Sequence, residues 1–361
     1  MKVKIQQFLF GKCHSWSIVA QNIANQLIKE HTVDLISTDG VQDKFVPNNL
    51  KDRIKLIPEG MYDMQLSYTL PHNMPKFLSY GNKNRFGIWC YEFPIIPAEQ
   101  IKYINGACDL LLPPSTFAKQ SFVDCKAQEN KIKVLPHGIN LEDFTNKNKF
   151  KIVTDKKIKF LVPLGQPHLR KNIKNTVEYF FRTFNKNDDV ALILKAPNKK
   201  AGGHDVSVNE IITSLKNKYK NHPEIKLIGD FVPNMVELYN ACDVVYSLTR
   251  AEAFFMPALE GFAANKIVMI PRYGGQLDFC NDQNSILFEG KAVQADREAQ
   301  YWGGHINNVW FESDFDDVSA KLKAVASNYQ AILDSKEELM KQQVNKYTWE
   351  NVTKQLVGYC Q

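Results

Sequence analysis

Residues 248–270 read LTRAEAFFMPALEGFAANKIVMI, and this stretch decides the fold. The apolar run before it, Val244 to Ser247, is typical of a buried strand, and the run Ile267 to Ile270 at its end is typical of a second. Between the two runs, Pro257 is suited to the first turn of a helix. The order strand, loop, helix, strand predicts parallel strands joined by a helix, which is the repeating unit of doubly wound α/β proteins.

The same alternation continues along the whole chain. On the N-terminal side it predicts strands at Val3 to Phe10, Val33 to Ile36, Ile54 to Ile57, Phe86 to Tyr91, Leu110 to Leu112 and Ile132 to Leu135. Around the opening stretch it predicts further strands at Lys159 to Pro163, Val190 to Leu194, Ile225 to Ile228 and Ile286 to Phe288. The polar segment 145–157 (TNKNKFKIVTDKK) separates the two series. We therefore expect an α/β chain of two Rossmann-like doubly wound domains, 1–150 and 151–339, with a C-terminal helix at about 340–361 that can pack back on the first.

The composition is that of an ordinary folded protein, with 44% hydrophobic and 23% charged residues. The seven cysteines are scattered, with no pair at the spacing of zinc or redox motifs, so we expect reduced thiols in a cytoplasmic protein. The N-terminal MKVKIQQFLFGK is interpreted as the first strand and not as a signal peptide, and no apolar stretch approaches a membrane span. A net charge of +6 suits phosphate-bearing ligands or an anionic membrane surface, although a solvated basic face is the simpler interpretation.

Two carboxylates lie in the part of the opening stretch where a ligand is expected. In open parallel sheets, ligands bind beyond the carboxyl ends of the strands, where helix N-termini present amides and a positive dipole. Glu252 lies in the loop after the strand, and Glu260 lies on the following helix. A carboxylate there can accept two hydrogen bonds from a diol such as ribose, and the amides of Phe254, Phe255 and Met256 are suited to phosphate or sugar oxygens. The alternative is that Glu252 caps the turn and Glu260 is a solvated helix residue.

The stretch from Asp243 to Ile270 resembles the retaining GT-B glycosyltransferases of the glycosyl transferases group 1 family, often called family 4. In that family the motif is Glu-Gly-Phe-Gly-Leu-Pro-x-x-Glu, and its two glutamates correspond to Glu252 and Glu260. The resemblance implies a GT-B fold, two Rossmann-like domains facing across a cleft, in which Glu260 holds the donor ribose and Glu252 contacts the transferred sugar. It also adds Leu259 to the donor-binding residues. The sequence departs from the family where glycine is usual, at Ala253, Phe255 and Asn265.

A basic pair is expected in the segment Phe160 to Asn172 (FLVPLGQPHLRKN). The segment resembles the loop after the first strand of the family's second domain, where two basic residues bind the diphosphate. Lys171 matches the lysine, and Arg170 supplies the second charge because Gln166 stands near the place of the upstream arginine. Two cations there would stabilise the leaving diphosphate, a task that a metal ion performs in other transferases. Lys195 is a further candidate, with a solvated loop lysine as the alternative.

The nucleobase is expected at the turn from Ile228 to Val232. This turn resembles the base-binding turn of the family, where backbone groups near Gly229 and the aromatic face of Phe231 hold the base. An ordinary strand-to-helix turn is the alternative. The resemblance also implies that Gly11, in the first loop of the chain, faces the diphosphate.

The acceptor side is indicated by fewer residues. The segments Trp89 to Glu92 and Val134 to Ile139 (VLPHGI) resemble recurrent features of the family's first domain. They make Glu92 and His137 candidates for acceptor contacts, with a structural role as the alternative for His137.

Other reaction classes lack their motifs in this sequence. No G-x-G-x-x-G or P-loop lysine motif follows a strand, and no G-x-S-x-G elbow is present. Asp314 and Asp316 form the one acidic pair with metal-like spacing, and we interpret them as caps of the helix that follows.

These residues predict a metal-independent, hexosyltransferase-type enzyme. It is expected to move a sugar from a UDP-sugar or GDP-sugar to an acceptor hydroxyl with retention of anomeric configuration, without a cofactor. The resemblance favours a glycan or lipid-linked glycan as the acceptor, reached by a cytoplasmic protein at the inner membrane face. A modified DNA base or a protein is the alternative acceptor. A non-catalytic sugar-nucleotide-binding protein is an alternative of another class, motivated by Ala253, Phe255 and Gln166.

Overall fold

The chain forms two compact units. The computed structural model describes residues 1–7, 14–37, 40–41, 45–78, 84–166, 168–197, 207–295, 305 and 307–360. Unit 1 comprises Met1–Ile139 and Tyr347–Gln361, and unit 2 comprises Asn140–Lys346. None of the helices in these ranges is long and apolar enough to cross a membrane.

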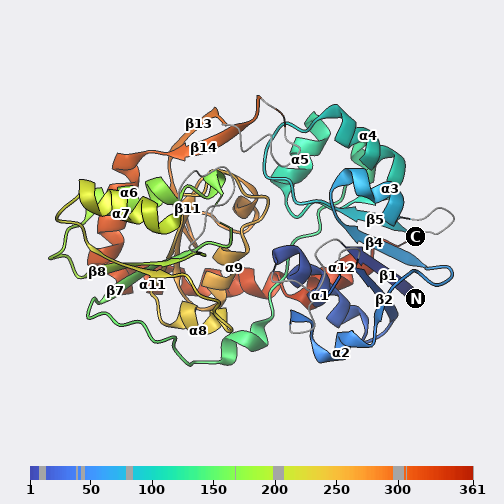
Figure 1. Cartoon of the computed structure of the whole chain (residues 1–361), viewed down its shortest axis with the longest axis horizontal. Helices are drawn as coiled ribbons and strands as arrows, with labels where there is room; N and C mark the ends of the chain where they lie inside the picture. The colour runs from blue at the N-terminus through green and yellow to red at the C-terminus, as the bar shows by residue number, and fades with distance from the viewer. Residues whose placement is uncertain are drawn as a thin grey trace. The chain divides into compact units, whose positions relative to one another are not determined.

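Unit 1 is built on a parallel sheet with the strand order β3-β2-β1-β4-β5-β6. Its strands are β1 (Lys2–Gln7), β2 (Thr32–Ser37), β3 (Ile54–Lys55), β4 (Met64–Tyr68), β5 (Arg85–Ile88) and β6 (Leu110–Leu111). Its helices are α1 (Ser15–Leu27), α2 (Asn48–Lys51), η2 (Pro71–Asn73), α3 (Met74–Phe77), α4 (Ala98–Ala107), α5 (Thr116–Asp124), η3 (Glu129–Lys131) and α12 (Trp349–Val357). Figure 1 shows α1 and α12 on one face of this sheet and α3 and α4 on the other. This is a Rossmann-like doubly wound domain, as the sequence predicts.

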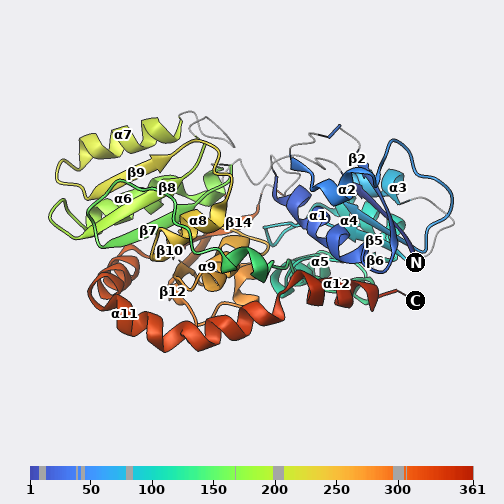
Figure 2. The same ribbon diagram turned by 90° about the horizontal axis from the view of Figure 1, so that it is seen from below.

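Unit 2 repeats the same plan, with the strand order β12-β11-β10-β7-β8-β9. Its sheet strands are β7 (Ile158–Pro163), β8 (Val190–Lys195), β9 (Glu224–Ile228), β10 (Val244–Tyr246), β11 (Ile267–Pro271) and β12 (Ile286–Phe288). Its helices are η4 (Leu141–Thr145), η5 (Leu169–Lys171), α6 (Ile173–Thr183), α7 (Val208–Lys218), α8 (Met235–Asn240), α9 (Met256–Ala263), η6 (Gly275–Asp278) and α11 (Phe315–Lys346), which is kinked at Asn328. Figure 2 shows α6 and α7 on one face of the strands and α9 on the other. The sequence prediction of a second doubly wound domain is confirmed.

A small antiparallel hairpin in unit 2 was not predicted. Its strands β13 (Gly290–Gln294) and β14 (Val309–Ser313) form a two-stranded sheet among the described residues, and Figure 1 shows them in orange near one end of α6. Strand β13 is mostly exposed, so it lacks the apolar run by which the other strands are recognised.

Two other strand predictions need correction. Strand β4 was missed, because Gln65 and Ser67 interrupt its apolar pattern although both are buried. The predicted strand from Ile132 to Leu135 is reduced to one isolated bridge between Leu111 and Ile132. Backbone hydrogen bonds from Lys133 and Leu135 still tie this segment to the edge of the sheet.

The division between the units lies at Asn140 rather than at the predicted boundary after residue 150. Phe150 donates its backbone N–H to Glu237 O at 2.8 Å, and Asn240 Nδ2 donates to Asn146 O at 2.8 Å. The segment before residue 150 is therefore already fastened to α8 of unit 2. Helix α12 belongs to unit 1, where Trp349 donates its backbone N–H to Ile139 O.

Candidate functional site

A buried ion cluster lies beyond the carboxyl ends of β7 and β10, which are neighbours in the sheet of unit 2. Lys171 Nζ lies 2.5 Å from Glu252 Oε1, and Arg170 Nη1 lies 3.1 Å from Glu252 Oε2. Thr249 Oγ1 donates to the same Oε1 at 2.8 Å. Glu252 is 6% exposed, so protein groups rather than water satisfy its carboxylate. The structure thus brings together the three residues that the sequence proposed for catalysis.

Two cations contact the one carboxylate of Glu252. Burial alone would raise the pKa of Glu252, but Lys171 and then Arg170 hold it below its usual value. The carboxylate therefore stays ionised and fixes both cations in place. Cationic side chains held beyond the carboxyl ends of parallel strands are suited to an anionic ligand such as a phosphate group.

Backbone contacts fasten the two loops that carry the cluster. The N–H of Arg250 donates to Arg170 O at 2.7 Å, and Thr249 Oγ1 donates to the same carbonyl at 3.3 Å. In return, Arg170 Nη1 donates to Ala251 O at 3.0 Å. The loop after β7 and the loop after β10 thus form one connected structure, and neither cation depends on a single side-chain contact for its position.

The turn before α9 keeps a glycine-like backbone without a glycine. Phe255 has φ 64° and ψ 65°, in the left-handed region that bulky residues rarely adopt. Its side chain is buried, and its ring centroid lies 5.7 Å from Lys171 Nζ. Asn265, another departure from the family pattern, also has a positive φ, 56°. Both positions keep the conformation that glycine adopts readily, at a cost of roughly 1–2 kcal/mol for a residue with a Cβ.

Glu260 has a different environment from Glu252. Tyr239 Oη donates to Glu260 Oε2 at 2.5 Å, and Glu260 has no other hydrogen-bond donor within the ranges that the structure describes. Burial raises the pKa of Glu260, although the hydrogen bond from Tyr239 acts in the opposite direction. Oxygen Oε1 of this carboxylate therefore has no protein partner in that part of the chain, which suits a residue that binds hydroxyl groups.

Three predicted donor-side residues follow neighbouring strands at the same sheet edge. Lys195 ends β8 and is paired in register with Ile228, the last residue of β9. Gly229 and Phe231 come directly after β9, and Phe231 is 63% exposed. An exposed aromatic side chain after a strand of a parallel sheet is suited to stacking on a flat ligand.

Some residues around the start of α9 offer backbone N–H groups to a ligand, and others place their side chains in the core. The backbone N–H groups of Phe255 and Met256 have no acceptor within the described ranges, so they are available to a ligand. The side chains of Phe254 and Leu259 are buried, and the Phe254 ring packs at 5.0 Å from Phe279. These two side chains belong to the core beneath the site.

The acceptor-side candidates lie in unit 1. His137 Nε2 lies 3.4 Å from Cys90 Sγ, which lies 2.8 Å from Tyr68 Oη. Burial lowers the pKa of His137 to about 3 and raises the pKa values of Cys90 and Tyr68. All three groups are therefore uncharged near neutral pH. Glu92 is half-buried, and its negative charge contributes to the raised pKa values of Cys90 and Tyr68.

Other predictions have simpler outcomes. Asp314 Oδ1 accepts the N–H groups of Asp316 at 2.9 Å and of Asp317 at 3.0 Å, so Asp314 caps α11 as predicted, whereas Asp316 lies in the first turn. The described residues contain no group of three or more His, Cys, Asp or Glu side chains that could hold a metal ion. Gly11 lies outside the described residues. Thr249 and Tyr239 were missed in the sequence, since neither residue type alone signals a contact with a distant glutamate.

Comparisons with known proteins concern the fold. No protein-family model and no curated protein sequence matches this chain. A glycosyltransferase structure from Rickettsia africae is 16% identical with a TM-score of 0.75, covering 99% of this chain and 97% of its own. Anabaena HepE in complex with UDP is 12% identical with a TM-score of 0.74, covering 99% of both chains. Sucrose-phosphate synthase from Thermosynechococcus elongatus is 12% identical with a TM-score of 0.71, covering 98% and 97%. The chain therefore has the fold of GT-B glycosyltransferases, with two Rossmann-like domains.

Proposed function

We propose that this protein is a glycosyltransferase that takes a sugar from a nucleoside diphosphate sugar. The observation that carries the proposal is the buried cluster of Glu252, Lys171 and Arg170, which places two cations at the carboxyl edge of a Rossmann-like sheet. The fold likeness supports it, because several proteins with this fold are glycosyltransferases and HepE was crystallised with UDP and with UDP-glucose.

Each residue near the cluster has a proposed task. Arg170 and Lys171 bind the diphosphate and stabilise its charge as the bond to the sugar breaks. Glu260 accepts hydrogen bonds from the ribose hydroxyls through Oε1, and Phe231 stacks on the nucleobase. Glu252 orients the sugar and keeps the two cations in place. The N–H groups of Phe255 and Met256 bind phosphate or sugar oxygens, with Lys195 as a further phosphate contact and Gly229 beside the base.

The finer features of the reaction belong to the same proposal. The acceptor hydroxyl forms its bond to the anomeric carbon on the face that the diphosphate leaves, so configuration is retained, and the reaction is that of a hexosyltransferase. Two cations neutralise the leaving group, so no metal ion is needed. Glu92 and His137 contact the acceptor, for which we propose a glycan or a lipid-linked glycan at the inner membrane face.

Ligand screening followed by a release assay tests the proposal. Thermal-shift measurements with UDP-, GDP- and ADP-sugars identify the donor, and release of the nucleoside diphosphate is then measured with wild-type protein, Glu260→Ala and Lys171→Ala. We expect donor-dependent stabilisation, and turnover that falls in both variants. Unchanged turnover in both variants would show that the assigned residues are wrong.

The same assay separates the non-catalytic alternative. A sugar-nucleotide-binding protein would be stabilised by the ligand but would release no nucleoside diphosphate with any acceptor. The strained turn at Phe255 motivates keeping this alternative, because a buried ring stands where glycine leaves space in the family.

A further inference from the structure

The β13–β14 hairpin contacts residues that flank the ion cluster. The hairpin strands are paired from Gly290 opposite Ser313 to Gln294 opposite Val309. A Cβ added at Gly290 would overlap the backbone of β14, so the strands approach closely there. This close pairing fixes the position of Glu312, which lies on β14 and points away from the hairpin towards the loop after β7.

Glu312 contacts the loop after β10 and the residues that directly follow the basic pair. Its Oε1 lies 2.5 Å from Arg250 Nη2, and its Oε2 lies 3.4 Å from Asn172 Nδ2 and 3.3 Å from Asn175 Nδ2. Asn172 directly follows Lys171 and has a positive φ of 54° at the start of α6. A carboxylate on the hairpin thus holds the residue at which the chain turns from the basic pair into the helix.

Arg250 completes the connection from the other side. Its Nη1 donates to Leu169 O at 3.2 Å, and its backbone N–H donates to Arg170 O at 2.7 Å. Its guanidinium lies over the Trp310 ring at 4.4 Å, and its carbonyl accepts the N–H of Phe311 at 2.9 Å. Arg250 is therefore bound to the hairpin and to the loop of the basic pair at once, through two guanidinium nitrogens and an aromatic stack for which arginine is suited.

We propose that Glu312 and Arg250 are positioning residues that hold Arg170 and Lys171 where they meet the diphosphate. The inference rests on the proposed function. Neither residue touches the ligand in this proposal, since Glu312 acts through Arg250, Asn172 and Asn175. Binding and catalysis by charged groups depend on their placement, and a displacement of about 1 Å can cost roughly 100-fold in rate. The hairpin then supports the diphosphate-binding loop, and we call this support by Glu312 and Arg250 the brace.

Paired nucleotide titrations test the brace. Wild-type protein is titrated with UDP, GDP and ADP by calorimetry, and the tightest-binding diphosphate is paired with its own monophosphate. For Glu312→Gln and for Arg250→Lys we expect the affinity for the diphosphate to fall about tenfold or more, while the affinity for the monophosphate changes less than about twofold. A merely structural role would not separate the two nucleotides. In the double variant the loss should be smaller than the sum of the two single losses, because both residues serve one contact.

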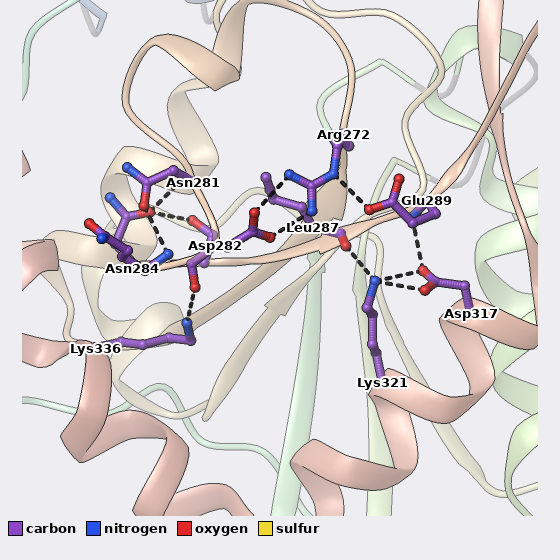
Figure 3. Close-up of polar contacts among 11 residues, drawn as sticks. Arg272, Asn281, Asp282, Asn284, Leu287, Glu289, Asp317, Lys321 and Lys336 are labelled. Carbon is purple, nitrogen blue, oxygen red and sulfur yellow. Dashed lines mark hydrogen bonds and ion pairs between the residues drawn. The ribbon is translucent and has the colours of Figure 1, made fainter.

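Glu289→Gln is the matched control. Glu289 directly precedes β13 and pairs with Arg272 Nε at 2.7 Å, within an exposed network that also includes Asp282 (Figure 3). This variant removes an ion pair beside the hairpin without touching the loop of the basic pair, so both affinities should stay unchanged.

The outcomes distinguish the brace from the proposed function. If wild-type protein binds none of the nucleotides, the proposed function fails and the inference fails with it. If Lys171→Ala loses diphosphate affinity but Glu312→Gln and Arg250→Lys keep it, or lose both affinities equally, only the brace is overturned.

Discussion

The carboxyl edges of the two sheets follow the same strand plan but have opposite chemistry. In unit 2 the edge carries a buried carboxylate, Glu252, with Lys171 and Arg170 against it. In unit 1 the corresponding edge carries Tyr68, Cys90 and His137, which form a chain of polar contacts. The pKa values of Tyr68 and Cys90 are raised and that of His137 is lowered, so each shift favours the neutral form of the group.

The difference follows from how the buried ionisable groups at each edge are stabilised. A buried charge is costly unless an opposite charge and hydrogen bonds compensate it, and unit 2 supplies both around Glu252. Around His137 burial is the cause of the lowered pKa, so the ring stays neutral. We infer that the edge of unit 2 is suited to an anionic ligand and the edge of unit 1 to uncharged hydroxyl groups.

The largest test of this contrast removes a cation from unit 2. Lys171→Ala should lower turnover by roughly 100-fold or more, because one of the two charges opposite the leaving diphosphate is lost. Release of the nucleoside diphosphate at saturating donor measures the effect. Lys174→Ala is the control, since Lys174 lies on the neighbouring α6 with its side chain exposed. An equal loss in both variants would mean that general positive charge, not the cluster, drives the reaction.

A smaller effect is expected at Glu260, whose pKa is raised by burial. Removing the carboxylate in Glu260→Gln should weaken donor binding about tenfold, the worth of one hydrogen bond to a charged group. Because the ionised form accepts the ribose hydroxyls, wild-type affinity should fall as pH is lowered through this raised pKa. Tyr239→Phe removes the bond that opposes the shift, so the fall should begin at higher pH. Calorimetric Kd values between pH 5 and 8 check both points, and a flat profile would speak against ribose binding by Glu260.

The neutral edge of unit 1 should respond to acid before the charged edge does. The folded pKa of His137 is about 3, below the unfolded value of about 6.5, so the folded state binds fewer protons. Stability that is full above about pH 6.5 should be lost below it, by up to about 1.4 kcal/mol per pH unit. The pKa of Glu252 is also lowered, but its contribution is present above its unfolded value of about 4.3 and is lost only as pH falls below that.

Urea unfolding of wild-type protein and His137→Asn at pH 7.5 and 5.5 measures this difference. The variant should lose less stability than wild type between the two pH values. Equal losses would mean that His137 is not held neutral, and the contrast between the two edges would weaken.

The sequence predicts the fold well because most strands are continuous apolar runs. It fails at β4, where the buried Gln65 and Ser67 hide the pattern, and at β13, which is exposed. The sequence shows whether a segment is apolar, whereas the burial of that segment depends on the strands and helices that pack against it.

The candidate site is predictable where the motif is local and not where it depends on distant contacts. Glu252 and Lys171 are far apart in sequence, but both follow strands of one parallel sheet, so topology alone brings them to the same edge. Glu312 comes from a hairpin that no sequence signal places next to Arg250. The sequence does not indicate a polar contact for Cys90, because this residue lies in the apolar segment Phe86 to Tyr91, which is typical of a strand.

The smallest expected effect concerns the turn on which the charged edge depends. Phe255→Ala and Phe255→Gly both remove the buried ring, so they lose similar packing, but only alanine keeps a Cβ at φ 64°. The glycine variant should therefore be more stable than the alanine variant by about 1 kcal/mol. Ala253→Gly provides the control, because Ala253 does not have a positive φ and glycine there should destabilise by about 0.5–1 kcal/mol. Urea unfolding of the four proteins measures both signs. If the glycine variant were no more stable than the alanine variant, the turn would not need the left-handed backbone at residue 255. Phe255 would then not be a replacement that preserves the backbone geometry of the family's glycine.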